Sequence, residues 1–299
     1  MPSNEAGTSV TVAAPAKLNL YLHVLGRRDD GYHLLDSLIV FADLHDVVRA
    51  APAGALTLDV TGPFAPALEG APGNLILTAA ERLSSAAGCR EGAHITLVKN
   101  IPVAAGLGGG SADAAAALMA LDQLWGLGLG AAGLADIAAG IGADVPVCLE
   151  SRSAFAGGIG GELTPARLPP LWLVIANPGR PVATADVFGA FDGPFGSPAR
   201  FTDVAEDVGA LAALLRRREN QLTPAAAAMV PDIADLAAQL TALPGCELAR
   251  MSGSGASCFG LFTHEAQARD GAGRLDRGHP GWWAASARLT EGRGGLTSI

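Results

Sequence analysis

The sequence predicts an α+β fold in two lobes. Runs in which polar and apolar residues alternate, as in half-buried strands, occupy 8–24 and 94–98. Runs with helical spacing, rich in alanine and leucine, occupy 74–87 and 131–141. A chain of 299 residues, 49% of them hydrophobic, is long enough for one large domain or for two modest ones, each with its own core.

The N-terminal segment 8–24 is expected to form one or two strands. Pro15 interrupts the run, so the residues after it are expected to begin a new strand or an edge. Lys17 and Asn19 are two positions apart and therefore share one face of that strand. From local sequence alone, an ordinary solvated strand lysine is the more frequent interpretation of Lys17.

A turn follows at 27–31, where the string RRDDG ends in an Asp-Gly pair suited to a tight hairpin. Tyr32 and His33 then open the next strand, which continues through 34–41. Their composition alone predicts half-buried strand residues without a special role.

The segment 99–122, which reads KNIPVAAGLGGGSADAAAALMALD, has the pattern strand, glycine loop, helix start. Ser111, or Asp113 just after it, is a plausible N-cap or first-turn acid for the helix. Backbone N–H groups at a helix start, with glycines that allow close approach, form an anion site. Since the chain contains 39 glycines, a simple tight turn explains the glycines equally well. No lysine precedes Ser111, which excludes a Walker loop.

Asp144 lies in the string Gly-Ala-Asp-Val-Pro at 142–146. An acidic residue between glycine and a β-branched residue before proline belongs in a fixed turn rather than on a free helix face. Local sequence favours an Asx-turn or N-cap aspartate here.

The remaining elements follow the same rules. Asn74 is a candidate N-cap and Gly88 a candidate stop for the helix 74–87. We place the boundary between the lobes within 155–165, giving lobes 1–160 and 161–299. Further strands are expected at 43–48, 56–60, 171–176 and 258–262, an amphipathic helix at 208–218, and a second glycine turn at 251–260. The stretch 270–281 is polar and glycine-rich, and the residues from 290 onward are expected to be loose.

Composition excludes several classes of protein. A formal net charge of −9 argues against nucleic acid and anionic membranes as partners. Four scattered cysteines and six histidines form no metal-spaced cluster, and the cysteines fit a reducing cytosol. No signal peptide is visible, and aspartates interrupt the most apolar region, 114–149. We therefore expect a cytoplasmic protein, a monomer or homodimer.

The string P-V-A-A-G-L-G-G-G-S-A-D-A-A resembles the ATP-phosphate loop of the GHMP kinases, which include galactokinase, homoserine kinase and mevalonate kinase. The strings A-P-A-K-L-N-L-Y-L-H-V and G-Y-H-L-L-D-S are similar to the opening of one branch of that family, whose acceptor is a cytidine diphosphate-linked methylerythritol. The resemblance covers 10–262 in separate blocks, and it implies a strand and glycine turn at 153–162 and a helix start at 184–188. It implies a ribosomal protein S5 domain 2-like N-terminal lobe and a ferredoxin-like C-terminal lobe.

The resemblance also implies an activity: ATP-dependent phosphorylation of the 2-hydroxyl of that acceptor, in the non-mevalonate route to isoprenoid precursors. ATP and Mg²⁺ are the implied cofactors, and the Mg²⁺ ligands stay open. Asp144 matches the catalytic aspartate and Lys17 its lysine, which either holds Asp144 ionised or neutralises charge at the phosphate.

Other site residues follow from the same resemblance. The expected ATP-binding residues are Pro102, Val103, Ala104, Ala105, Gly106, Leu107, Gly108, Gly109, Gly110, Ser111 and Ala112. The expected acceptor-binding residues are Asn19, Tyr32, His33, Thr184 and Phe188, and a supporting glycine turn comprises Ser252, Gly253, Ser254 and Gly255. Two alternatives stay open: another small-molecule kinase of the family, such as a homoserine or mevalonate kinase, and a catalytically silent nucleotide-binding member.

Overall fold

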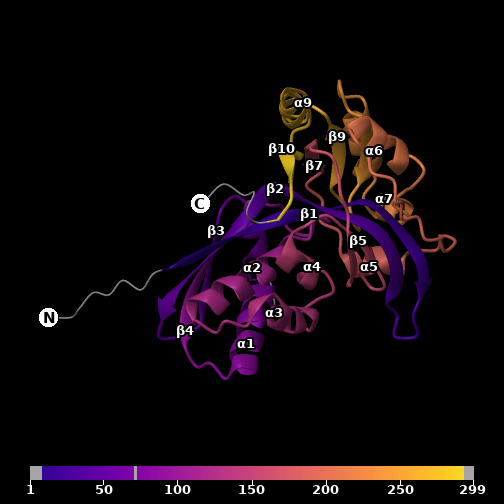
Figure 1. The fold of residues 1–299 in the computed structure, drawn as a ribbon. Helices are drawn as coiled ribbons and strands as arrows, with labels where there is room; N and C mark the ends of the chain where they lie inside the picture. The colour runs from indigo at the N-terminus through magenta and orange to yellow at the C-terminus, as the bar shows by residue number, and fades with distance from the viewer. Residues whose placement is uncertain (1–8, 71–72, 293–299) are drawn as a thin grey trace.

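A long antiparallel hairpin organises the structure, a computed structural model in which residues 9–70 and 73–292 are described. Its strands β1 (Val10–Arg27) and β2 (His33–Ala53) pair from Val10 with Ala50 to Arg27 with His33. The hairpin arches across the whole molecule in indigo (Figure 1). It therefore reaches both halves of the chain.

The other strands extend the sheet on both sides of β2. The path runs β3-β4-β2-β10-β7-β9-β8, and β5 with β6 branches from β2. In the first half these are β3 (Thr57–Thr61), β4 (Gly92–Val98), β5 (Ala154–Gly157) and β6 (Glu162–Pro165). In the second half they are β7 (Trp172–Asn177), β8 (Leu248–Met251), β9 (Cys258–Phe262) and β10 (Trp283–Thr290).

Helices of the first half gather on one side of β1, β2 and β4. They are the 3₁₀ helix η1 (Ala65–Leu68), α1 (Leu75–Ala87), α2 (Gly109–Leu124), α3 (Gly130–Ala139) and α4 (Val145–Glu150). Helix α2 packs against β1, β2, α1 and α4 at once. Its buried positions are mostly alanines, because a helix enclosed on several sides needs small side chains.

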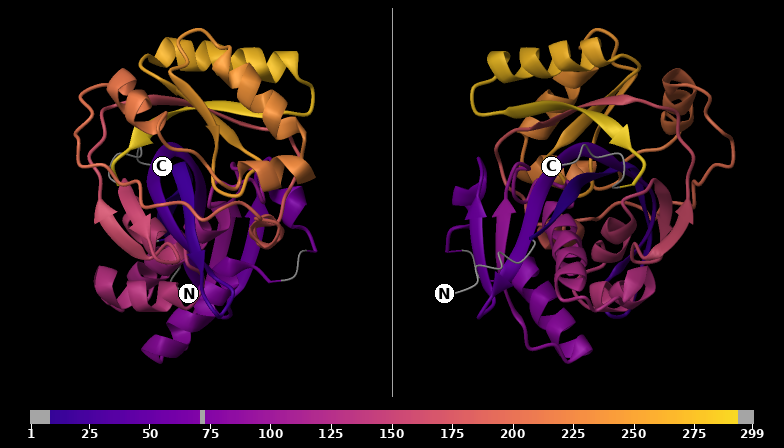
Figure 2. Two further views of the ribbon diagram at one scale, coloured as in Figure 1. Left: turned by 90° about the vertical axis from the view of Figure 1, so that its right-hand side faces the viewer. Right: turned by 60° about the vertical axis from the view of Figure 1, so that its left-hand side comes forward.

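The second half carries α5 (Thr184–Gly189), α6 (Val208–Leu215), α7 (Thr223–Met229), α8 (Asp232–Thr241) and α9 (Glu265–Gly278). Figure 2 shows α9 lying across the strands of this half, at the opposite end of the molecule from α1.

Three clusters of buried apolar residues form the core. One lies under α1 and α2, and another under α8 and α9. The middle cluster joins Leu18 and Leu20 of β1 to Leu173 of β7 and Phe259 of β9. The two halves thus share a core beneath the hairpin, and a division at residue 160 stays a prediction.

The prediction that Pro15 interrupts the strand is wrong. β1 runs through it as one strand, and the register shifts between Pro15 and Lys17. A bulge is a place where a strand tolerates proline, because the ladder is locally broken and the missing N–H costs little. Lys17 and Asn19 do share one face of β1, and both are buried.

The C-terminal region is more regular than its composition indicates. The polar, glycine-rich stretch 270–281 lies largely within α9, whose Ala268, Gly271 and Leu275 face the core. Thr290, where loose residues were expected to begin, is buried at the end of β10. Residues 293–299 lie outside the described part. Within the described part, no helix is both long and apolar enough to cross a membrane.

We expect Ala115→Leu to destabilise the protein by about 1–3 kcal/mol, because α2 has no space for three more carbons at this fully buried position. The measurement is the free energy of unfolding in urea. Ala86→Leu, at an exposed position of α1, is the matched control and should change it little. Equal effects of the two substitutions would refute close packing around α2.

Candidate active site

One large cleft gathers residues from both halves of the chain. Its volume is about 1220 Å³. Among the residues expected to form a site, it is lined by Lys17, Asn19, Tyr32, His33, every residue from Pro102 to Ser111, Asp144, Thr184, Phe188, Gly253 and Ser254. Ala112, Ser252 and Gly255 are buried behind the lining.

Lys17 and Asp144 meet in this cleft. Lys17 Nζ donates a hydrogen bond to Asp144 Oδ2 at 3.0 Å, although 127 positions separate them. The Lys17 side chain is 7% exposed, while Asp144 is 40% exposed and open to the cleft. Asp144 directly precedes α4, yet its side chain makes no capping bond. Asp144 does occupy the N-cap position that local sequence favoured, but its carboxylate faces the lysine and the cleft instead of capping the helix.

The glycine loop depends on two left-handed glycines, Gly106 (φ +72°) and Gly108 (φ +62°). A Cβ on Gly108 would lie 3.0 Å from Lys17 Cβ, and one on Gly106 would lie 2.5 Å from the Gly255 carbonyl oxygen. Only glycine allows both approaches. The loop is fixed to β1 by a hydrogen bond from Lys17 N to Leu107 O at 2.9 Å.

Helix α2 begins directly after this loop, at Gly109 with Gly108 as its N-cap. The expectation that Ser111 or Asp113 caps the helix or supplies an acid to its first turn is wrong: no side chain caps it, and its first turn holds no acidic residue. The first N–H groups of a helix lack partners within it, so they are left to bind an anion.

The second glycine turn packs against the first. Ser252 Oγ donates to Gly106 O at 3.0 Å and accepts from Asn19 N at 3.2 Å. Ser257 N donates to Ala105 O at 3.1 Å. Asn220 Nδ2 holds the turn itself by donating to Met251 O and Gly253 O at 2.9 and 2.8 Å. Asn220 was not among the residues that the sequence predicted for the site.

Aromatic side chains line the end of the cleft near the hairpin tip. His33 stacks on Phe188 with ring centroids 5.2 Å apart, and Phe191 meets His33 edge-on at 6.2 Å. Burial, and secondarily the charge of Arg27, lowers the pKa of His33, so its imidazole is neutral at pH 7. Tyr32 beside it is 58% exposed. This end offers exposed aromatic faces and a neutral polar ring.

Two more polar side chains connect the ends of the cleft. Thr184 Oγ1 lies 2.9 Å from Ser254 Oγ, which ties α5 to the second glycine turn. Asn19 Nδ2 donates to Ser37 Oγ at 2.7 Å. Asn19 Oδ1 is buried and, within the described residues, has no hydrogen-bond partner.

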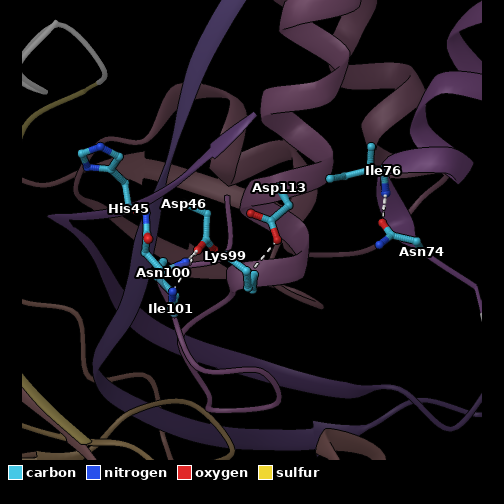
Figure 3. Close-up of polar contacts among 8 residues, drawn as sticks. All are labelled: His45, Asp46, Asn74, Ile76, Lys99, Asn100, Ile101 and Asp113. Atoms are coloured by element: carbon cyan, nitrogen blue, oxygen red, sulfur yellow. Dashed lines mark hydrogen bonds and ion pairs between the residues drawn. The ribbon is translucent and has the colours of Figure 1, made fainter. Parts of the chain in front are cut away.

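A buried cluster beneath the glycine loop was not predicted from sequence. Lys99 Nζ donates to Asp46 Oδ2 at 2.5 Å and to Asp113 Oδ2 at 2.7 Å (Figure 3). Burial raises the pKa of the Asp113 carboxyl; Lys99 opposes this shift and Asp46 adds to it. The sequence feature that could have indicated this cluster is that Lys17 and Lys99 are the only lysines in the chain.

The apolar end of the cleft was also missed. It lies between β3, η1 and α1, beside the start of the glycine loop. Its side chains are Leu56, Leu58, Val60, Leu68, Leu75, Leu77 and Leu97. An apolar slot next to an anion site suits a planar base attached to phosphates.

A divalent cation brought by a nucleotide fits this cleft. Asp144 presents a partly exposed carboxylate, and the Ser111 position lies at the start of α2; both line the same space. Mg²⁺ is commonly held by one or two such oxygens together with phosphates. Among the described residues, no group of three or more His, Cys, Asp or Glu side chains forms a separate metal site.

Comparison with known proteins identifies the family. The model for the GHMP kinases N terminal domain matches residues 74–152, and that for the GHMP kinases C terminal matches 202–280. The chain is 50% identical to the 4-diphosphocytidyl-2-C-methyl-D-erythritol kinase of Paramagnetospirillum magneticum, over 94% of this chain and 99% of that one. It is 53% identical to the enzyme of that name from Cereibacter sphaeroides, over 92% and 98%. The chain belongs to this kinase family.

Solved structures of GHMP kinases have the same fold as this chain. A crystal structure of 4-(cytidine 5'-diphospho)-2C-methyl-D-erythritol kinase superposes with a TM-score of 0.75 at 36% identity, covering 94% of this chain and all of that one. A homoserine kinase from Cytophaga hutchinsonii gives a TM-score of 0.70 at 19% identity, covering 98% and 97%, which shows the fold alone. The GHMP kinase fold expected from the sequence is confirmed, and with it the use of ATP.

We expect Gly106→Ala to weaken ATP binding by about tenfold or more, because its Cβ would push the loop away from the second glycine turn. Gly126→Ala is the control: Gly126 is also left-handed (φ +61°), but nothing lies within 4 Å of its Cβ position. Both substitutions cost about 1 kcal/mol of backbone strain. Calorimetric titration with Mg·ATP measures the difference, and unchanged ATP affinity in Gly106→Ala would contradict the role of this contact.

Proposed function

We propose that this kinase transfers the γ-phosphoryl group of ATP to the 2-hydroxyl of 4-diphosphocytidyl-2-C-methyl-D-erythritol, in the non-mevalonate route to isoprenoid precursors. The observation that carries the proposal is the Lys17–Asp144 pair at the centre of a cleft with an anion-binding loop beside it. The relatives' name, together with the aromatic end of the cleft, supports the choice of acceptor.

ATP binds with its phosphates on the glycine loop. The residues Pro102 to Ala112 supply backbone N–H groups and the start of α2 supplies its positive dipole end. The apolar slot beside β3 and α1 receives the base. Asp144 or Ser111 would hold Mg²⁺ beside the phosphates, and the ion would neutralise phosphate charge there.

Asp144 acts as the general base. The acceptor hydroxyl oxygen forms a bond to the γ-phosphorus, the bond from that phosphorus to the ADP oxygen breaks, and the hydroxyl proton passes to the Asp144 carboxylate. Lys17 holds this carboxylate in place by a hydrogen bond of 3.0 Å. The same ammonium, at the edge of the phosphate loop, opposes negative charge as it develops on the phosphoryl group.

The aromatic end recognises the cytosine ring. Tyr32 and Phe188 supply ring faces for stacking, and the neutral imidazole of His33 can donate or accept a hydrogen bond at the base's polar edge. Asn19, whose Oδ1 has no partner within the described residues, and Thr184 line the same cleft and are proposed to contact the methylerythritol part. The turn Ser252, Gly253, Ser254, Gly255 supports the phosphate loop. Lobes 1–160 and 161–299 each contribute to the acceptor site.

We expect the purified protein to release ADP from Mg·ATP only when 4-diphosphocytidyl-2-C-methyl-D-erythritol is the acceptor. The acceptor panel also holds homoserine, mevalonate and galactose, each tested alone. Turnover with another member would retain the phosphate loop and the base but overturn the assignment of Tyr32, His33 and Phe188. ATP binding without turnover on any member would favour a catalytically silent protein.

We expect Asp144→Asn to lower kcat by about 10²–10⁴-fold, because an amide cannot accept the hydroxyl proton. The dissociation constant for ATP should change little, since the loop and α2 hold the phosphates. Asp136→Asn, at an exposed position of α3 outside the cleft, is the control and should leave kcat unchanged. A near-normal kcat in Asp144→Asn would exclude Asp144 as the base.

A further inference from the structure

We propose that Asp113 is a positioning residue for ATP binding: together with Lys99 and Asp46 it fastens the two ends of the phosphate loop to each other and to β2. The loop leaves β4 at Lys99 and enters α2 at Gly109, and Asp113 lies one turn into that helix. The Lys99–Asp113 ion pair of 2.7 Å therefore closes the base of the loop.

Asp46 fixes the start of the loop, where the chain leaves β4. Its Oδ2 accepts from Lys99 Nζ, and its Oδ1 accepts from the backbone N–H groups of Asn100 and Ile101 at 2.5 and 2.8 Å. Asn100 Nδ2 donates in turn to His45 O at 3.0 Å (Figure 3). The first two residues of the loop are thus held by one carboxylate on β2.

The cluster is almost fully buried, and Lys99 and Asp113 form part of the wall of the cleft. The side chains of Lys99, Asp46 and Asp113 are 3%, 0% and 5% exposed. A Cβ on Gly109 would lie 2.9 Å from Lys99 Nζ, so the helix start and the ammonium are in direct contact. Among the described residues, Lys99 is the one cation between two carboxylates, so replacing the Asp113 carboxylate removes one of the two acceptors that hold its ammonium in place. Moving Asp113 therefore moves Gly109 and the loop with it.

The partners of a buried carboxylate distinguish a residue that positions the phosphate loop from one that only stabilises the fold. Another buried carboxylate, Asp36 of β2, accepts from Tyr21 OH, Ala199 N and Arg200 Nε, and is 2% exposed. It makes no contact with the phosphate loop. Asp36 and Asp113 are thus similar in burial and charge pairing, and differ in what they hold.

The test compares Asp113→Asn with Asp36→Asn, both nearly equal in shape to the native side chain. Mg·ATP is titrated calorimetrically in the absence of acceptor, so the result does not depend on which acceptor the proposed function names. We expect Asp113→Asn to raise the dissociation constant for ATP by about tenfold and to speed amide hydrogen exchange over 100–112. Asp36→Asn should leave both unchanged. With acceptor present, Asp113→Asn should raise KM for ATP more than it lowers kcat.

Two results would overturn the proposal. One is an unchanged ATP dissociation constant in a folded Asp113→Asn protein. The other is an equal rise in Asp36→Asn, which would indicate a general loss of stability. Asp113→Ala removes the contact altogether and should exceed Asp113→Asn in effect; if it does not fold, Asp113→Asn with its exchange measurement decides alone.

Discussion

The site depends on the close approach of three backbone segments around Gly106. β1 reaches the phosphate loop through the hydrogen bond from Lys17 N to Leu107 O, and the second glycine turn reaches it through Ser252. A Cβ at Gly106 would lie within 2.9 Å of atoms of that turn. These segments come from distant parts of the chain. The absence of a side chain at Gly106 therefore determines how closely the halves of the protein meet at the cleft.

Few positively charged side chains lie around the contact at Gly106. Lys17 and Lys99 are the only lysines, and both are buried and paired with aspartates on either side of the loop. Most arginine ion pairs, such as Arg269 with Glu265, lie at exposed positions where a pair contributes little. In a chain of net charge −9, an anionic substrate must therefore be attracted by local donors: the loop amides, the start of α2 and Lys17.

Local signals in the sequence predicted local structure well. Asn74 caps α1 and accepts from Ile76 N, and Gly88 ends that helix in the left-handed conformation, as the pattern indicates. Structure that depends on residues far apart in the sequence was harder to predict. Pro15 interrupts no strand because β2 supports a bulge there, and Asp113 caps no helix because Lys99, fourteen positions earlier, binds it in the core. α9 was missed because its polar composition conceals a narrow apolar face.

The division of the cleft explains why the fold alone does not determine the acceptor. The end that the proposed function assigns to ATP is made by the glycine loop, α1, α2 and β3, all within the first half of the chain. The aromatic end combines Tyr32 and His33 at the hairpin tip with Phe188 on α5, so it depends on how the second half meets the hairpin. A homoserine kinase shares the fold at 19% identity. Under the proposed function, acceptor choice is therefore a property of a few side chains where the two halves face each other, while phosphate binding rests on the backbone of the glycine loop.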